Sequence, residues 1–216
     1  MKKFKAFTLV ETLIVIVIFC VGILTVLNWL SQTLRNKDYA NIQIKSAFFA
    51  REWIELMFNL RDANYRKELP WNCVFKPNKN PGPIDDKNIL DNPFCDEYFT
   101  PETVLKIWMW SDDKFIYADK SELKNDFEED FENFQIYLHT WSDLNGFTGY
   151  LYNHEKGNGE ETWFARYLVI KEVSDENGDI DEEKLLKIES HVLYKRWYLT
   201  GEKVMETFIW NYDFNQ

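Results

Sequence analysis

The chain has few of the residues that interrupt regular structure. Its 216 residues include only 8 Gly and 6 Pro, and half of the prolines fall within residues 77–83. Residues 1–69 contain no Pro and only one Gly, Gly22. Internal repeats and low-complexity tracts are absent as well, which excludes a solenoid or a compositionally biased chain. The first third of the sequence can therefore form one long, uninterrupted helix.

Basic residues are also scarce, and this excludes one large class of function. The chain has 25 Lys and Arg against 36 Asp and Glu, so its formal net charge is −11. Proteins that bind phosphate-rich partners usually carry a basic patch. We therefore expect no direct contact with nucleic acid.

The residue patterns of common active sites are missing too. No Ser lies in a Gly-x-Ser-x-Gly elbow, and no Gly-rich loop suits a phosphate group. The three histidines lie far apart, without Cys or Glu at metal-ligand spacing, and we interpret them as surface or strand residues: His139, His154 and His191. The sequence predicts no catalytic residue, no cofactor and no small-molecule substrate.

Only three cysteines occur. Cys20 lies in an apolar run, where a small buried thiol is the simplest interpretation. Cys73 and Cys95 lie in a polar, loop-like region. If that region is extracytoplasmic, a disulfide is favoured because such compartments are oxidising, and two free thiols are the alternative. A Cys73–Cys95 bridge would stabilise the fold by roughly 3 kcal/mol through the unfolded state.

The longest apolar run covers residues 7–30, where Glu11 is the only charge. As a helix these residues would extend ~36 Å, enough to cross a bilayer core of ~30 Å. The flanking charges favour an N-terminus on the inside: Lys2, Lys3 and Lys5 precede the run, and Arg35 and Lys37 follow it. A polar helical pattern continues after the run, which argues against a cleaved secretory signal.

Glu11 is not explained by a simple membrane anchor. A carboxylate within a membrane segment is costly and by default indicates a function. The alternative is that Glu11 lies near the membrane surface and reaches water.

The stretch "KAFTLVETLIVIVIFCVGIL" resembles the start of a type IV prepilin. That family has a short basic leader, a small residue, the pattern Phe-Thr-Leu-x-Glu and an apolar helix. The resemblance implies that a prepilin peptidase removes residues 1–6 by cutting between Ala6 and Phe7, and that Phe7 is then N-methylated. The family usually has Gly before the cut, and Ala6 is also small.

The resemblance further implies a role for Glu11 and a set of partners. In family filaments the matching glutamate meets the N-terminal amine of a neighbouring subunit, and a low dielectric strengthens that attraction. Glu11 would then set the register between helices. The implied partners are other pilin subunits, the prepilin peptidase and the membrane. The precursor would lie in the cytoplasmic membrane and join an extracellular filament after assembly.

The helical pattern continues past the apolar run and predicts one helix from about Thr8 to Arg61. Residues 31–64 would be amphipathic and lie against a sheet, with apolar positions at Tyr39, Ile42, Ala47, Ala50, Ile54, Met57 and Leu60. The second half also resembles PilV-like minor pilins. The positions that match this resemblance are Ala50, Arg51, Glu52, Ile54, Glu55, Arg61, Asp62 and Asn64. The charged groups among them are expected to be solvated, with ion pairs worth tenths of a kcal/mol.

The rest of the chain divides into a loop region, residues 65–105, and a sheet, residues 106–216. Seven short runs rich in aromatic and β-branched residues predict antiparallel strands. The segment "SELKNDFEEDFENF" is either a short acidic helix or a loop. The predicted fold is α+β and pilin-like, with a long N-terminal helix packed on an antiparallel sheet.

Two features leave alternatives open. The segment "DENGDIDEE" spaces oxygen ligands as a Ca²⁺ loop does, but its Gly is misplaced, so a solvated acidic loop is the alternative; the oxygens belong to Asp175, Asn177, Asp179, Asp181 and Glu183. Four strand tryptophans are expected in the core, with binding of a glycan or a partner as the alternative: Trp141, Trp163, Trp197 and Trp210.

These observations predict a structural protein and not an enzyme. The expected function is that of a minor pilin in a type IV pilus-like filament. The alternatives are a pseudopilin of type II secretion or competence and an uncleaved single-pass, membrane-anchored binding module. Removal of the leader with its three lysines would take the formal charge from −11 to −14.

Overall fold

One helix, α1 (Leu9–Arg66), occupies the first third of the chain. The computed structural model describes residues 9–66, 69–74, 97–109, 116–142, 148–154, 156–173 and 185–211. Within these residues the predicted long helix is confirmed, and it continues five residues beyond the expected end at Arg61. No Pro interrupts the chain before Pro70. The chain divides into two compact units, Met1–Gln43 and Ile44–Gln216, and α1 runs through both.

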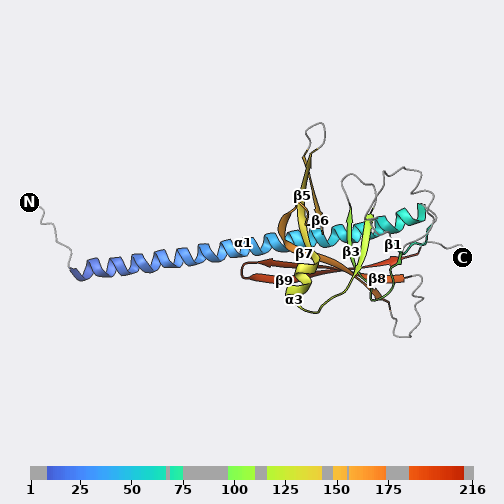
Figure 1. Ribbon diagram of the computed structural model, residues 1–216. Helices are drawn as coiled ribbons and strands as arrows, with labels where there is room; N and C mark the ends of the chain where they lie inside the picture. Colours follow the sequence, from blue (N-terminus) through green and yellow to red (C-terminus); the bar gives the residue numbers. More distant parts are fainter. Residues whose placement is uncertain are drawn as a thin grey trace, which may run out of the picture. The chain divides into compact units, whose positions relative to one another are not determined.

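Seven antiparallel strands form the main sheet of the second unit (Figure 1). Strand β7 lies centrally: it pairs with β8 on one side and with β3 and β5 on the other. The strands are β3 (Val104–Met109), β4 (Ile116–Ser121), β5 (Gln135–Ser142), β6 (Thr148–Asn153), β7 (Glu160–Glu172), β8 (Leu185–Arg196) and β9 (Leu199–Trp210). All seven fall on the predicted apolar runs, so the predicted α+β architecture with an antiparallel sheet is confirmed.

The acidic segment after β4 is a helix. Helix α3 (Phe127–Phe134) begins after Asp126, whose carboxylate accepts hydrogen bonds from the backbone N–H groups of Glu128 and Glu129. This N-cap satisfies donors that the first helical turn leaves without partners. Two further strands, β1 (Cys73–Val74) and β2 (Glu97–Tyr98), pair with each other in the region expected to be irregular.

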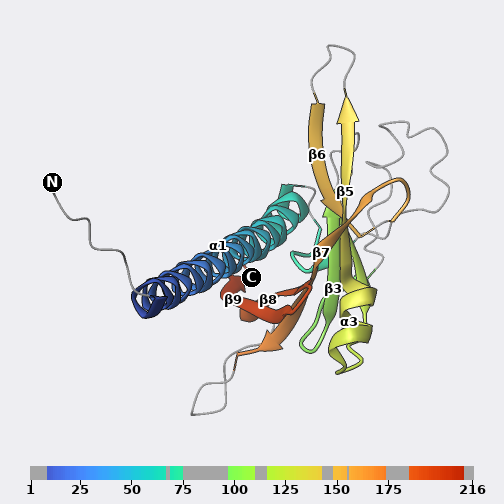
Figure 2. The same cartoon turned by 90° about the vertical axis from the view of Figure 1, so that its left-hand side faces the viewer.

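The two helices cover opposite faces of β7 (Figure 2). Side chains alternate between faces along a strand. On one face Phe164 contacts Phe49 of α1, with ring centroids 5.1 Å apart. On the other face Tyr167 contacts Phe134 of α3 at 4.7 Å. Because both faces are covered, β7 is buried continuously from residue 164 to residue 170.

A buried ion pair joins α1 to β7. Arg166 is 1% exposed, and its Nη1 lies 2.5 Å from Oε2 of Glu52. Its Nη2 donates to the carbonyl of Tyr152 at 3.1 Å, and its guanidinium lies over the Trp53 ring. Burial lowers the pKa of Arg166, and the Glu52 carboxylate opposes that change. The only sequence signal for this pair was a lone Arg in the apolar strand "TWFARYLVI".

The expectation of a fully solvated charged face on α1 is therefore wrong in part. Arg51 and Glu55 do form an exposed pair, with the two side chains 71% and 57% exposed. Arg61 and Asn64, in contrast, are buried. Asn64 donates to the carbonyls of Trp71 and Cys73 at 3.1 and 2.9 Å. The amide side chain of Asn64 thereby ties the segment after α1 to the end of the helix.

A charge network lies on the face of the sheet that α3 partly covers. Its centre is Glu189, a buried carboxylate of β8. Lys171 Nζ lies 2.6 Å from Glu189 Oε2, and Lys187 Nζ lies 2.9 Å from Glu189 Oε1. Burial alone would raise the pKa of Glu189, but hydrogen bonds from the two lysines outweigh burial and lower it from 4.5 to about 2.

His191 extends this network to β9. Its ring stacks on Tyr167, with centroids 4.8 Å apart. Its Nδ1 lies 2.6 Å from Oε1 of Glu202, and its Nε2 lies 3.4 Å from Oε2 of Glu189. The contact with His191 lowers the pKa of Glu202. The network therefore links three neighbouring strands through their side chains.

Loss of Glu52 should destabilise the second unit, because Arg166 would remain buried without its carboxylate. Breaking a buried pair costs ~3–5 kcal/mol, and the partial exposure of Glu52 reduces this to ~2–3 kcal/mol. We expect Glu52→Ala to lower the melting temperature of the full chain in detergent by about 4–12 °C, measured by near-ultraviolet circular dichroism. The matched control Glu55→Ala removes an exposed pair and should change stability by no more than ~0.5 kcal/mol. Equal decreases in melting temperature for Glu52→Ala and Glu55→Ala would show that the Glu52–Arg166 pair contributes no more to stability than an exposed pair.

Acid should destabilise the fold through Glu189. The folded-state pKa of Glu189 lies below its ordinary value of 4.5, at about 2. This contribution is therefore present above pH ~4.5 and is lost as the pH falls toward 2; it amounts to at most ~3 kcal/mol. Stability measured between pH 6 and pH 2 should fall less steeply in Glu189→Gln than in the native chain. Parallel acid profiles for the two proteins would show that Glu189 does not carry this dependence.

Candidate functional site

The membrane-facing candidate is the first half of α1. Over its most apolar 18 residues the mean hydropathy is 2.8, and none of that segment is buried within the chain. Among the residues that the structure describes, α1 is the helix long and apolar enough to cross a membrane. Two hydroxyls in this segment bond to carbonyls of the helix itself: Thr12 to Leu9 and Thr25 to Val21, each at 2.8 Å. These polar groups are thus satisfied inside the helix, as a hydrocarbon environment requires.

Glu11 is the acidic residue in the first turn of α1. It is exposed, and its neighbours one turn along the helix, Ile14 and Val15, are exposed apolar side chains. The helix dipole favours a negative charge in this turn. The structure therefore places one exposed carboxylate among exposed apolar side chains of the helix.

Several predicted site residues lie outside the described residues. These are the cleavage pair Ala6 and Phe7, the second cysteine Cys95, and the calcium candidates Asp175, Asn177, Asp179, Asp181 and Glu183. The predictions made for them stay predictions.

The described cysteines have different states. Cys73 is disulfide-bonded, and it pairs with Tyr98 in the β1–β2 register, three residues beyond Cys95 in the sequence. Its predicted bond to Cys95 stays a prediction. Cys20 is a free thiol exposed on α1, so the expectation that the chain buries it is wrong.

The histidines lie in strands or directly after one. His154 directly follows β6; burial lowers its pKa well below the usual value, and its Nδ1 lies 3.3 Å from the Gln135 carbonyl oxygen. His191 belongs to the network around Glu189, and His139 lies in β5. In the part of the chain that the structure describes, no group of three His, Cys, Asp or Glu side chains could hold a metal ion.

The tryptophans expected in the core are partly at the surface. Trp163, Trp197 and Trp210 are 46%, 79% and 43% exposed, so the core prediction is wrong for these three. The side chain of Trp141 lies outside the described residues. Trp197 occupies the β8–β9 turn with φ +54°, and a turn side chain points away from the sheet core. Arg196 stacks on Trp163, with its Cζ 3.9 Å from the ring centroid.

Comparison with known proteins identifies the start of the chain. The family model of the prokaryotic N-terminal methylation motif matches residues 1–27. That stretch includes Ala6, Phe7 and Glu11. No curated protein and no solved structure matches the chain. Together with the exposed apolar half of α1, which is long and apolar enough to cross a membrane, the matched motif supports a type IV pilin-like protein.

Proposed function

We propose that this chain is a minor pilin: a non-catalytic subunit that a prepilin peptidase processes after Ala6 and that joins a type IV pilus-like filament. The observation that carries the proposal is Glu11, an exposed carboxylate on the apolar half of α1 and inside the matched methylation motif. A membrane anchor has no use for such a charge, because an intramembrane carboxylate costs several kcal/mol.

Cleavage after Ala6 supplies the group that makes this charge useful. It would create an α-amine on Phe7, four residues before Glu11. Within one helix an amine and a carboxylate four residues apart can meet, but a filament also offers the amine of a neighbouring subunit. In a medium of low dielectric, that contact between subunits is far stronger than in water. Glu11 would thus favour one axial position of a subunit over all others.

The second unit fits the part of a subunit that faces solvent. In its sheet β7 and β8 each pair with strands on both sides, and α1 and α3 cover opposite faces of β7. The predicted Cys73–Cys95 disulfide suits an oxidising exterior. The strongly acidic composition suits a hydrated exterior. A subunit of a type II secretion filament would also need an acidic unit that faces solvent. The location of the assembled subunit therefore distinguishes a pilus from a secretion filament.

Processing should be visible in the mass of the N-terminus. Chain extracted from membranes of a peptidase-positive host should begin with N-methylated Phe7, and chain from a peptidase-negative host should begin with Met1. A bulky side chain should not fit the peptidase site that accepts Ala6, so Ala6→Leu should also retain Met1, whereas Ala6→Gly should be cut. Intact Met1 on the native chain in the peptidase-positive host would rule out processing.

Removal of the charge at Glu11 should separate insertion from assembly. Glu11→Gln keeps the size of the side chain, so membrane insertion should be unchanged. Its incorporation into filaments should drop by at least about tenfold, since a buried pair that loses one partner costs several kcal/mol. Immunogold labelling of sheared filaments measures incorporation, and Val15→Leu is the control on the same apolar surface. Normal labelling of Glu11→Gln would refute the register role.

A further inference from the structure

An exposed aromatic cluster lies at the turn between β8 and β9. Trp197 and Tyr198 form this two-residue turn and are 79% and 58% exposed. Arg196 stacks on the exposed ring of Trp163 in β7, with its Cζ 3.9 Å from the ring centroid. The same Cζ lies 5.1 Å from the ring centroid of Trp197. Arg196 therefore joins two tryptophan rings at the surface, and we call these four residues the turn cluster.

Trp197 adopts a backbone conformation that disfavours a bulky side chain. Its φ of +54° lies in the left-handed region. A positive φ at the first central position of a two-residue hairpin turn usually calls for glycine, which adopts it without steric cost. Strained residues of this kind gather at functional sites. The turn thus displays a large aromatic ring to solvent at a position where glycine would be more stable.

The hairpin around the turn cluster is basic, although the whole chain is acidic. The stretch "LYKRWYLTG", residues 193–201, contains Lys195 and Arg196 but neither Asp nor Glu, whereas the chain has a formal charge of −11. Lys195 forms an ion pair with Glu128 of α3, and Arg196 is the cation among the rings. Trp and Tyr are enriched where proteins meet the lipid headgroups, and basic residues attract anionic headgroups. The turn cluster therefore has the composition of a membrane-surface contact.

The turn cluster lies at the end of the second unit where its part of α1 begins. Phe49 contacts Phe164, and Glu52 contacts Arg166, so α1 and β7 run in the same direction. Trp163 precedes this stretch of β7, and the β8–β9 turn lies beyond the same end of the paired strands. Figure 1 shows this turn at the left end of β8 and β9. The cluster is thus on the side of the lower residue numbers of α1.

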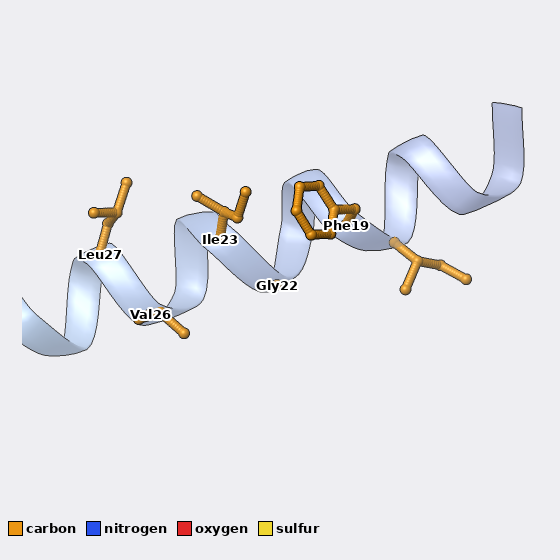
Figure 3. Close-up of a pocket in the computed structure, with 6 residues that line it drawn as sticks. Phe19, Gly22, Ile23, Val26 and Leu27 are labelled. Carbon is orange, nitrogen blue, oxygen red and sulfur yellow. The ribbon is translucent and has the colours of Figure 1, made fainter. Parts of the chain in front are cut away.

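The chain ties this end of the second unit to the apolar segment of α1. Figure 3 shows part of that segment, with apolar side chains such as Phe19 and Leu27 projecting from the helix before and after Gly22. Ile44, the first residue of the second unit, follows Leu30 by only 14 positions. Even a fully extended chain of this length reaches no more than ~50 Å. A bilayer that holds the apolar segment is therefore always available to the start of the second unit.

We propose that the turn cluster is a second membrane contact, in which Trp197 and Tyr198 enter the headgroup region of a phospholipid bilayer and Arg196 meets anionic headgroups. The proposal rests on the membrane insertion in the proposed function and does not depend on entry into a filament. A single aromatic turn binds a bilayer weakly, but the chain's own membrane segment raises its effective concentration at the surface. The contact would fix one orientation of the second unit at the membrane before assembly.

Lipid quenching of a fluorophore in vesicles tests this contact. The full chain is reconstituted in phosphatidylcholine and phosphatidylglycerol vesicles that contain a lipid with a nitroxide on its headgroup. In a Cys20→Ser background, Thr200→Cys carries the fluorophore beside the turn, and Glu172→Cys carries it at the opposite end of β7; both sites are exposed. Residue 172 lies ~30 Å beyond Trp163 along the strand. Quenching at position 200 should exceed quenching at position 172 at least about threefold, and the Cys20→Ser chain alone sets the background.

Trp197→Gly separates the membrane contact from folding. Glycine suits the positive φ, so this variant should keep or raise the melting temperature while it removes the ring. Quenching at position 200 should fall at least about threefold, and Trp197→Tyr, which keeps an interfacial aromatic residue, should retain most of it. Phe208→Ala is the matched control, because Phe208 is an exposed aromatic residue of β9 outside the turn. It should leave quenching at position 200 unchanged.

The role of Arg196 has its own test. Quenching at position 200 should be stronger in vesicles with phosphatidylglycerol than in vesicles of phosphatidylcholine alone, because anionic headgroups attract the guanidinium. Arg196→Gln should lose this increase, and Arg196→Lys, which keeps the charge, should retain it. Equal quenching of the native chain in both kinds of vesicle would refute the contact with anionic headgroups.

The outcomes separate this inference from the proposed function. If the chain floats with the vesicles after alkaline extraction, equal quenching at positions 200 and 172 would overturn the inference alone. Quenching that rises with the number of chains per vesicle would indicate a second copy at the turn and would overturn it too. So would a fluorophore at position 200 that iodide in water quenches freely, which would leave the cluster to a soluble ligand such as a glycan. A chain that does not float would refute membrane insertion, and with it both proposals.

Discussion

A helix in hydrocarbon must satisfy all of its backbone hydrogen bonds by itself, and α1 is built around that constraint. The chain meets it by avoiding proline up to residue 69 and by using glycine once. The hydroxyls of Thr12 and Thr25 bond to the helix as well. The result is one element of 58 residues that belongs to both compact units of the chain. Among the described residues nothing buries its most apolar segment, and its second half packs on the sheet.

The second unit depends on how the second half of α1 packs on the sheet. Trp53, Met57 and Leu60 of α1 enter the same hydrophobic core as the buried residues of β7 and β8. This interface also contains a charged pair, Arg166 with Glu52, whose side chains are 1% and 44% exposed. We infer that this pair adds specificity more than stability, because a shifted helix would leave Arg166 without its carboxylate. The pair therefore selects one position of the helix on the sheet.

The apolar half of α1 shows the complementary situation. The notable residues of this exposed half are a carboxylate, a glycine and a thiol: Glu11, Gly22 and Cys20. In our proposed function both halves of the helix use the same strategy: each carries a charge inside an apolar contact, and that charge penalises other alignments. In the second unit the partner is β7 of the same chain, and in our proposal the partner of the first unit is another subunit.

The sequence by itself determined the features that depend on local patterns. The membrane segment, the helix and the seven strands could all be predicted because periodicity, helix breakers and β-branched residues act over a few neighbouring positions. The methylation motif could be recognised for the same reason, since Ala6, Phe7 and Glu11 lie within six residues.

Only the tertiary structure decided which charges and aromatics are buried. Glu52 and Arg166 are 114 residues apart, and Lys171, Glu189 and His191 meet through strand register. No local rule distinguishes Arg51, which is exposed, from Arg61, which is buried. The same holds for Trp53 in the core and Trp197 at a turn. Burial depends on which distant strand covers a residue, and a one-residue change of register reverses the side of every side chain.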